Sequence, residues 1–374
     1  MGGFECSTHR NHTGKRIDVI AATDHDRFAK SDYENLLALN IKTARDGARW
    51  HLIEISPYRY DWSSVLGQII AAEETKIQII WDLFHYGYPD DLDLFSQEFI
   101  DRFAAFSKAF VELLLSRGEI KPFICLNNEI SFFAWAAGQV GAFYPFEKNR
   151  GDEMKRQLVR ASLAAAAEIK KIAPESVFIQ TDPVIRVLPS KQVNAVDARN
   201  FHNAQYHALD IMTGKTEPEI GGDPKFLDVI GVNYYSFNQW RHPSGEPILR
   251  SDKNYQPFSE ILGEYYARYQ KPLFIAETGI EDDARPDWFE YICSEVRIAM
   301  SNGVPIFGIC LYPIVNHPGW DDDRHCHNGL WDYADETGKR EIYEPLAAVI
   351  KKQMHEFEQA DLQTPFFLKK ASIG

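Results

Sequence analysis

The sequence predicts a closed (β/α)8 barrel, the TIM barrel of the α/β class, formed as a single domain. Strand-like and helix-like segments alternate along the chain with little interruption. The strand-like segments are continuously apolar, as in parallel sheets that are covered by helices. Eight such units in 374 residues fit a closed barrel. No G-x-G-x-x-G turn follows any of these strands, as a doubly wound nucleotide-binding sheet would usually require.

Eight apolar runs are expected to form the barrel strands. In chain order they cover residues 3–7, 44–55, 77–83, 123–127, 177–180, 227–233, 273–276 and 306–312. Amphipathic helical patterns cover residues 31–39, 96–115, 152–172, 195–212, 259–269, 286–300 and 345–357. The second helical pattern is the clearest, because Phe99, Phe103, Phe106 and Phe110 recur at three- and four-residue steps.

The barrel domain is expected to span residues 1–358, with residues 359–374 as a C-terminal tail. No internal repeat, low-complexity segment or linker divides the chain into further domains. The tail is too short to fold alone. It could dock on the barrel or on a second copy of the chain, which leaves a homo-oligomer open.

Composition limits the partners of the chain. A net charge of −14 argues against binding to a nucleic-acid backbone, which needs a basic face. No apolar stretch is long enough for a membrane span, and the N-terminus lacks the basic and apolar regions of a signal peptide. Five cysteines, an odd number, favour a reducing compartment over a secreted disulfide framework. We therefore expect a cytoplasmic protein without a nucleic-acid or membrane partner.

Two apolar runs end in a glutamate beside a small or polar residue. Glu129 follows the expected fourth strand and Glu277 follows the expected seventh strand. Active sites of this barrel class lie at the C-terminal ends of the strands, so both carboxylates should reach one site. Either glutamate alone could equally cap a helix or pair with a barrel arginine. Two of them at these strand ends favour catalysis.

A converging pair of carboxylates suits glycoside hydrolysis with retention of configuration. In that chemistry the two carboxyl groups lie about 5–5.5 Å apart. One attacks the anomeric carbon, and the other donates a proton to the leaving group and later recovers one from water. The proton donor needs a raised pKa, whereas the nucleophile needs hydrogen bonds that keep it ionised.

Around these residues the sequence resembles glycoside hydrolase family 1, the β-glucosidase and β-galactosidase family of the retaining (β/α)8 glycosidases. Asn128-Glu129 resembles the acid/base motif of the superfamily, and Ala276-Glu277-Thr278-Gly279 resembles its nucleophile motif. Further family-like segments follow in the family's order: Gly3-Phe4-Glu5-Cys6-Ser7, Ala48-Arg49-Trp50, Leu83-Phe84-His85-Tyr86, Gly231-Val232-Asn233-Tyr234-Tyr235 and Gly329-Leu330.

The resemblance implies a role for each matching residue at the reacting bond. Glu277 would be the nucleophile, and Glu129 would be the acid/base. Asn128 would bind the sugar 2-hydroxyl, and His85 would contact the sugar in the innermost subsite.

The resemblance also implies which groups support the nucleophile. Arg49 and Tyr235 would hold Glu277 and keep it ionised, with Asn233 supporting Tyr235. Arg49 could instead form a structural ion pair inside the barrel. Only one of Tyr234 and Tyr235 can face the barrel interior, because side chains alternate along a strand.

The chain departs from the family in its sugar-binding residues. The glutamine that the family carries on its first strand has no match, so Glu5, Ser7 or His9 must occupy that space. After the eighth strand, Tyr312 and Pro313 replace a Trp-Ser step. The family's Trp-Ser peptide is cis, and an X-Pro bond makes that geometry cheaper, so we predict a cis bond between Tyr312 and Pro313.

The family's Glu-Trp pair after the eighth strand is also replaced. Trp320 could still form a stacking platform, but the carboxylate that reads sugar hydroxyls is missing or displaced to Asp321. The sugar therefore cannot be inferred from the resemblance. The chain is also shorter than typical members of the family, which suggests trimmed loops around the substrate.

Two other kinds of chemistry fit the sequence less well. His325-Cys326-His327 lies near several aspartates and could bind zinc, but it falls in a polar loop after the eighth strand. We expect these residues to line the outer part of the site. Lys271 stands at the start of a strand, the wrong end for a Schiff-base lysine. No metal and no cofactor are therefore expected.

The sequence as a whole predicts a retaining β-glycosidase that acts on a small glycoside or a glycan terminus, with carbohydrate as its substrate. A transglycosidase with the same mechanism is an alternative, because acceptor choice depends on the shape of the outer site. A second alternative, from a different class, is a carbohydrate-binding barrel that has lost turnover.

Overall fold

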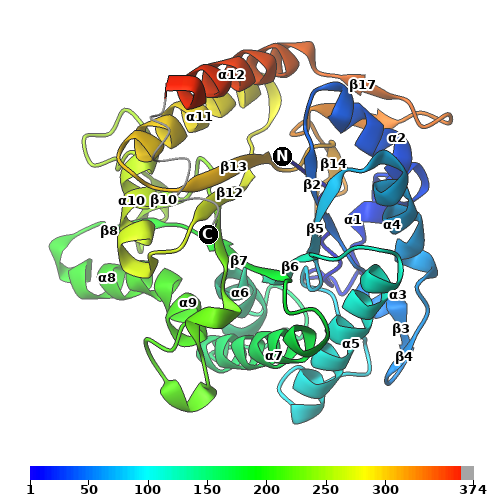
Figure 1. The fold of residues 1–374 in the computed structure, drawn as a ribbon. Coiled ribbons are helices and arrows are strands. Elements are labelled where there is room, and N and C mark those ends of the chain that lie inside the picture. Colours follow the sequence, from blue (N-terminus) through cyan, green and yellow to red (C-terminus); the bar gives the residue numbers. More distant parts are fainter. Residues whose placement is uncertain (364–374) are drawn as a thin grey trace.

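The computed structural model describes residues 1–363 and forms a closed barrel of eight parallel strands (Figure 1). This confirms the predicted single-domain (β/α)8 barrel. Around the barrel the strands follow the order β1 (Gly2–Gly3), β13 (Ile306–Leu311), β12 (Leu273–Thr278), β9 (Val229–Asn233), β7 (Val177–Pro183), β6 (Phe123–Asn128), β5 (Gln78–Asp82) and β2 (Thr43–Gly47).

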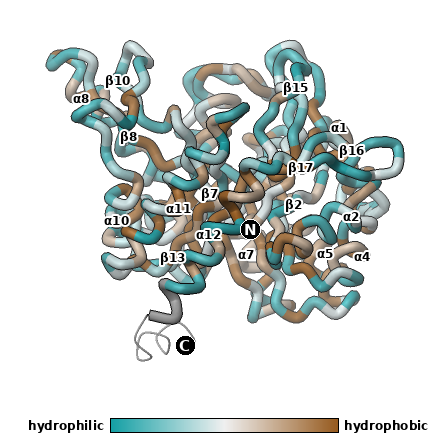
Figure 2. Tube along the Cα trace, turned by 90° about the horizontal axis from the view of Figure 1, so that it is seen from above, coloured by the Kyte–Doolittle hydropathy of each residue, from teal (hydrophilic) through white to brown (hydrophobic). Residues whose placement is uncertain are grey.

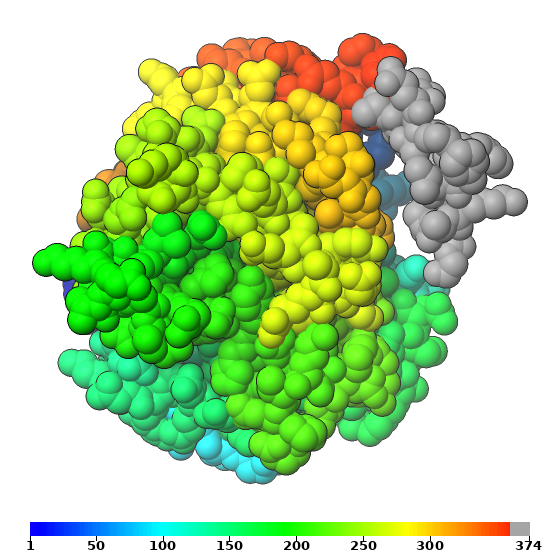
Figure 3. Space-filling model, turned by 90° about the vertical axis from the view of Figure 1, so that its left-hand side faces the viewer, coloured from blue at the N-terminus to red at the C-terminus, as the bar shows by residue number. Residues whose placement is uncertain are grey.

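An outer ring of helices surrounds the strands in Figure 1. The ring consists of α2 (His25–Ala38), α4 (Ser63–Thr75), α5 (Gln97–Ser116), α7 (Gly151–Ile172), α8 (Ala195–Asn203), α9 (His207–Met212), α10 (Phe258–Tyr269), α11 (Arg285–Ser301) and α12 (Glu344–Gln363). Figure 3 views the face where α8, α9 and α10 cover the barrel. The helix expected over residues 195–212 is interrupted by a 3-10 turn at Ala204–Tyr206.

Two parts of the prediction were wrong between the second and third barrel strands. The expected strand 44–55 ends as β2 at Gly47, and the short helix α3 (Trp50–Ile53) follows. An apolar run alone does not distinguish a buried strand from a buried helix, which explains this error. Helix α4 was not among the expected helical segments, and Gly67 in its middle lowers its helix propensity.

The barrel has two apolar layers. Inside it, Ile80, Cys125, Ile179, Val229, Phe274, Ala276, Cys310 and Tyr312 pack against one another. Outside it, the larger core joins strands to helices, and the four phenylalanines of α5 are fully buried there, as their spacing predicted. A filled interior leaves only the strand ends for chemistry.

Loops at one end of the barrel carry small sheets of their own. One sheet joins β8 (Arg186–Pro189), β10 (Gln239–His242) and β11 (Glu246–Pro247), and a hairpin joins β14 (His317–Pro318) to β15 (His325–Cys326). Figure 2 shows the β8–β10 region and the β15 region rising at the same end of the barrel. A second hairpin, β16 (Trp331–Ala334) with β17 (Arg340–Ile342), precedes α12.

Several smaller expectations can also be checked. The Tyr312–Pro313 bond is cis, as predicted. All five cysteines are free and buried. Among residues 1–363, no helix combines the length and the apolar character needed to cross a membrane. The predicted boundary after residue 358 falls inside α12, and residues 364–374 of the predicted tail lie outside the described residues.

Candidate active site

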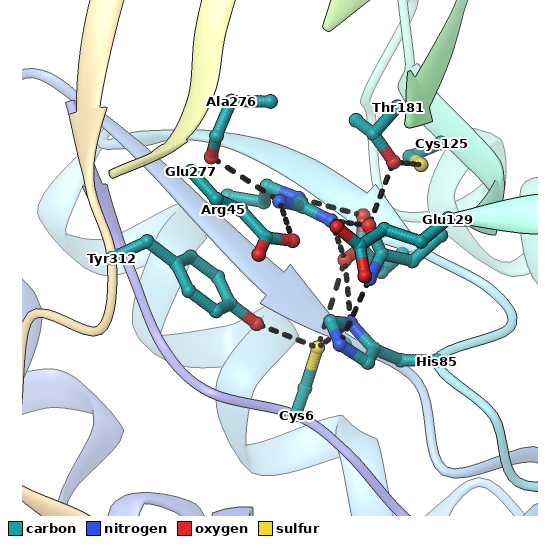
Figure 4. Close-up of polar contacts among 12 residues, drawn as sticks. Cys6, Arg45, His85, Cys125, Glu129, Thr181, Ala276, Glu277 and Tyr312 are labelled. Atoms are coloured by element: carbon teal, nitrogen blue, oxygen red, sulfur yellow. Dashed lines mark hydrogen bonds and ion pairs between the residues drawn. The ribbon is translucent and has the colours of Figure 1, made fainter. Parts of the chain in front are cut away.

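Glu129 and Glu277 lie at the C-terminal ends of two barrel strands. Glu129 directly follows β6, and Glu277 is the next-to-last residue of β12. Both residues are buried, with 8% and 5% of their surface exposed. Figure 4 shows their carboxylates on either side of the Arg45 guanidinium. The fold therefore brings the predicted pair into one site.

Hydrogen bonds fix Glu129 from three strand ends. Its backbone is in the left-handed region (φ 47°, ψ 59°), and its N–H donates to Thr181 O on β7. Asn233 Nδ2 on β9 donates to Oε1 (2.8 Å), and Tyr86 Oη donates to Oε2 (2.5 Å). Burial and then the negative charge of Glu277 raise the pKa of Glu129 to about 8. Glu129 is thus suited to carry a proton at neutral pH.

Glu277 is held by a different kind of partner. Arg45 Nη1 donates to Oε1 (2.7 Å), and Tyr235 Oη donates to Oε2 (3.0 Å). Burial raises the pKa of Glu277, while the positive charge of Arg45 opposes that shift. Among the described residues, a guanidinium contacts Glu277 but not Glu129, so the proton that the two carboxyl groups can share belongs on Glu129.

The arginine beside Glu277 is Arg45, and the prediction that Arg49 holds Glu277 was wrong. Arg49 lies beyond the end of β2, where its Nη1 donates to Asp18 (3.1 Å) and Asp26 (2.9 Å) outside the barrel. Arg45 pairs in register with Ile80, which faces the barrel interior. The sequence did contain a signal for Arg45, because a charged residue inside a short buried strand usually has a specific ionic partner.

The contact of Tyr235 with Glu277 agrees with the prediction, but that of Asn233 does not. Tyr234 points away from the site and stacks on Phe258, with ring centroids 4.1 Å apart. Asn233 was expected to support Tyr235, yet it contacts Glu129 instead. The backbone N–H of Tyr235 donates to Asn238 Oδ1 (3.0 Å). Thus Asn233 and Tyr235, two residues apart, serve different carboxyl groups.

A chain of hydrogen bonds fixes the protonation of His85. Arg45 Nη2 donates to Asn128 Oδ1 (2.5 Å), and a guanidinium can only donate. Asn128 Nδ2 is then the donor toward His85 Nε2 (3.0 Å), which must be the nitrogen without a proton. The ring proton therefore lies on Nδ1, 3.1 Å from Asp82 Oδ2.

Asp82 anchors Arg45 at the centre of this network. Arg45 Nε and Nη2 donate to its two carboxylate oxygens (3.1 and 2.7 Å), and both side chains are fully buried. Such two-point contacts fix the plane of a guanidinium. Neither residue was named among the predicted site residues, although Asp82 lies three residues before His85.

The His85 region also contains a thiol. Cys6 Sγ lies 3.1 Å from His85 Nδ1 and 3.7 Å from Asp82 Oδ2. A Cβ added at Gly47 would lie 2.5 Å from the Cβ of Cys6, so glycine makes room for this side chain. These three donors have the spacing of metal ligands. However, His85 Nδ1 carries the ring proton and Asp82 is bound to Arg45. Cys6, Asp82 and His85 therefore form a hydrogen-bonded cluster in this arrangement.

His325 and His327 form a second group with Asp332 at the surface. His325 Nε2 lies 2.7 Å from Asp332 Oδ1. The two imidazole rings stack at 4.4 Å with 20° between their planes. The ligand atoms of the three residues lie within 4.8 Å of one another, but lone pairs in nearly parallel stacked rings do not converge on one point.

An aromatic cluster lies next to Glu129. The ring of His9 stacks on Phe143 (4.0 Å) and meets Trp320 (4.9 Å) and Tyr86 edge-on. Tyr86 is the residue that donates to Glu129. The loops after β1, β5, β6 and β13 therefore converge here, and they include two of the predicted sugar-binding residues, His9 and Trp320.

Of the remaining predicted site residues, Tyr312 and Glu5 reach the site and Asp321 does not. The Tyr312 ring lies over the Arg45 guanidinium at 5.1 Å. Glu5 is buried beside His85. The Asp321 side chain is 60% exposed and pairs with His12, so it does not take the place of a carboxylate inside the site.

A cavity of about 410 Å³, lined mainly by polar side chains, shares no lining residue with the carboxylate site. It lies between α8, α9 and α10. Its ionic groups pair locally, Arg268 with Asp210 and His207 with Glu217. It contributes nothing to the carboxylate pair.

The fold and the site together define a (β/α)8 barrel with two buried glutamates at the ends of β6 and β12. No family model matches the chain, and no curated protein sequence resembles it significantly. Solved structures do share its fold. A β-glucosidase from Thermotoga maritima in complex with deoxynojirimycin matches with a TM-score of 0.75 and 18% identity over 92% of each chain.

Two further structures from Thermotoga maritima agree. A family 1 β-glucosidase gives a TM-score of 0.73 and 18% identity, covering 91% of this chain and 88% of that one. A β-glucosidase in complex with castanospermine gives 0.73 and 18% over 92% of each chain. The chain therefore has the barrel fold of the family 1 β-glucosidases, as the sequence resemblance predicted.

Proposed function

We propose that the protein is a retaining β-glycosidase that hydrolyses the β-glycosidic bond of a small glycoside or a glycan terminus. One observation carries the proposal: two buried glutamates face one site in opposite environments. Glu277 accepts from Arg45 and Tyr235, whereas Glu129 has a raised pKa and no cationic partner among the described side chains. This difference in environment is what allows one carboxyl group to act as a nucleophile and the other as a proton donor.

In the first step Glu277 attacks the anomeric carbon and forms a covalent glycosyl ester. Glu129 gives its proton to the glycosidic oxygen, which leaves with the aglycone as an alcohol. Loss of this proton leaves a Glu129 carboxylate, and the hydrogen bonds from Tyr86 and Asn233 stabilise that anion.

In the second step the Glu129 carboxylate takes a proton from water, and the water oxygen attacks the anomeric carbon. The ester bond breaks and the electron pair returns to Glu277, where Arg45 and Tyr235 stabilise the carboxylate. The sugar is released with its original configuration. The Glu129 proton is restored, so both groups return to their starting state.

Several buried polar atoms near the carboxylates support a polyhydroxylated ligand. Among the side chains of residues 1–359, Asn233 Oδ1, Trp320 Nε1 and both ring nitrogens of His9 find no hydrogen-bond partner. Buried polar groups are usually paired, and sugar hydroxyls could pair them here. Asn128, which lies beside the pair, would bind the 2-hydroxyl as the family resemblance implies.

Transfer to a sugar acceptor by the same two steps is a second candidate, because a hydroxyl could replace water in the second step. A barrel that binds carbohydrate without turnover is a third. The intact supports of both glutamates favour catalysis over this last candidate. We also infer a cytoplasmic enzyme, since its five free cysteines suit a reducing compartment.

The test is covalent trapping with 2-deoxy-2-fluoro β-glycosides of gluco, galacto, manno and xylo configuration. The fluorine slows hydrolysis of the ester, so peptide mass analysis should find the sugar on Glu277. The variant Glu277→Gln should take no label. Absence of label on the wild-type chain across all four sugars would remove the proposed mechanism.

A second experiment assigns Glu129. The variant Glu129→Ala should lose about 10²–10⁴-fold in rate on substrates with poor leaving groups and much less on activated aryl glycosides. Azide should restore part of the activity by attacking the ester in place of water. An equal loss for all leaving groups would contradict the acid role.

A further inference from the structure

Glu5 is a buried carboxylate without a cationic partner. Only 9% of its surface is exposed. It accepts hydrogen bonds from the backbone N–H (2.8 Å) and the hydroxyl of Ser7, both neutral donors. Within residues 1–363, the one ionisable nitrogen closer than 4.0 Å is His85 Nε2, at 3.6 Å. A buried charge is costly unless it is paired, so this arrangement calls for an explanation.

His85 does not supply the missing positive charge. Its Nε2 accepts a hydrogen bond from Asn128, whose orientation is set by Arg45. The same nitrogen cannot then hold a proton for Glu5. The only other cation of the network, Arg45, is engaged with Asp82, Glu277 and Asn128.

The charges around the sugar-binding residues are therefore unbalanced. With Glu129 protonated, one positive charge on Arg45 faces three carboxylates: Asp82, Glu277 and Glu5. The negative charge of Glu5 acts on both sides of the site. Burial, and then the charges of Glu277 and Glu129, raise the pKa values of Tyr235 and Tyr86, and the charge of Glu5 adds to both shifts. Glu5 thus adds uncompensated negative charge where the sugar ring would lie.

We propose that the natural substrate is an amino sugar glycoside, whose primary ammonium group binds the Glu5 carboxylate. This inference rests on the proposed glycosidase function. Sugar hydroxyls could also donate to Glu5, but a neutral hydroxyl leaves its charge uncompensated. An ammonium group donates and neutralises at once, and hydrogen bonds between charged groups are about twice as strong as neutral ones.

The experiment compares matched aryl β-glycosides: each neutral gluco, galacto and manno parent, and its analogues with an amine at carbon 2, 3, 4 or 6. At pH 6.5, at least one amine should exceed its parent in kcat/KM by about tenfold or more, as a new charged hydrogen bond allows. N-acetylation of that amine should abolish the preference. Preference for the neutral parent in every series would overturn the proposal.

The variant Glu5→Gln tests the partner. It should lower kcat/KM for the preferred amine by about 10–100-fold and change the neutral parent far less. Equal losses for both substrates would contradict a charge-specific role. The matched control is Glu341→Gln, which removes a carboxylate whose side chain is 80% exposed. It should leave the preference unchanged. If Glu5→Gln does not fold, the comparison of amino and neutral glycosides on the wild-type chain still tests the proposal.

The outcome also separates this inference from the glycosidase proposal. Covalent label on Glu277 from a neutral fluoroglycoside, without any preference for amines, would keep the mechanism and remove the amino sugar. Absence of turnover and label with neutral and amino glycosides alike would remove both.

Discussion

Two adjacent residues of β2 begin two buried charge networks on opposite sides of the same strand. Arg45 points into the barrel and joins Asp82 and Glu277. Asp46 points outward and contacts His25 (3.0 Å) under α2. Successive side chains of a strand point to opposite faces of the sheet. Arg45 therefore joins the network of the candidate site, and the next residue, Asp46, joins a network between the barrel and its helices.

The outer network is balanced in charge, and the inner network is not. His25 lies between Asp46 and Asp32, and Arg340 makes two hydrogen bonds to Asp32. Although burial lowers the pKa of His25, the neighbouring aspartates raise it to about 9, so two positive charges face two negative ones. The outer network shows that this chain can balance the charges of a buried network. Around Glu5 the negative charge is not balanced, and this difference is the basis for the proposed ammonium ligand.

The variant Arg45→Met should have the largest effect, because it damages both structure and chemistry. It leaves Asp82 and Glu277 without their counter-ion, and breaking a buried pair costs about 3–5 kcal/mol in unfolding free energy. Loss of the donor to Glu277, the proposed nucleophile, should also lower kcat by about 10²–10³-fold. Denaturant unfolding and steady-state kinetics on one preparation measure both effects.

The control for this variant is Arg49→Met, which sits four residues further along. Arg49 pairs with Asp18 and Asp26 outside the barrel. Its loss should leave kcat/KM within about twofold, because no transition-state contact is removed. A larger kinetic effect for Arg49 than for Arg45 would reverse the assignment of the two arginines.

The variant Arg340→Met breaks the outer network and should separate stability from activity. It leaves the aspartates in excess by one charge, at a cost of about 3–5 kcal/mol in unfolding free energy. The folded fraction should keep kcat/KM within about twofold. Lys339→Met is the matched control, since that side chain is 70% exposed. A kinetic loss like that of Arg45→Met would show that the two networks are not independent.

Stability should depend on pH through His25. Its pKa rises from 6.5 in the unfolded chain to about 9 in the fold. Because the folded-state pKa is the higher one, protonated His25 contributes fully to the unfolding free energy below pH 6.5. This contribution is lost as the pH rises through about 9. A shift of that size corresponds to about 3 kcal/mol. The difference in unfolding free energy between wild type and His25→Gln should therefore shrink over this range; a constant difference would contradict it.

Much of the fold was predictable because its signals are local. The phenylalanine stripe of α5 and the apolar strand runs report burial directly, and both glutamates followed from strand ends. Arg49 was matched to the family's second-strand arginine, inside an expected strand of residues 44–55, but β2 ends at Gly47 and Arg45 is the arginine within it. A shift in where β2 ends is enough to move an arginine from the barrel interior to its outer surface.

The contacts around the glutamates could not be predicted, because they join residues far apart in sequence. Asn233 reaches Glu129 across 104 positions, and Arg45 reaches Glu277 across 232. The position of Glu5 in the site was foreseen only as one of three candidates for a missing glutamine. Its lack of a counter-ion depends on the orientation of Asn128, and only the three-dimensional network reveals that.

The smallest predicted effect concerns the basic limb of the pH profile. Glu129 must be protonated to act as an acid, so kcat/KM should fall above its pKa of about 8. The Tyr86 hydroxyl donates to the Glu129 carboxylate and lowers this pKa. The variant Tyr86→Phe should therefore shift the basic limb upward, by up to about one pH unit.

Tyr88→Phe is the matched control for that shift, because the Tyr88 hydroxyl is buried and has no partner among the described side chains. It should leave the basic limb in place. If Tyr86→Phe moved the limb downward, Tyr86 would be stabilising the protonated form of Glu129. If neither variant moved it, the limb would report another group. An upward shift for Tyr86 alone would tie the basic limb to Glu129, as its role in the inner network requires.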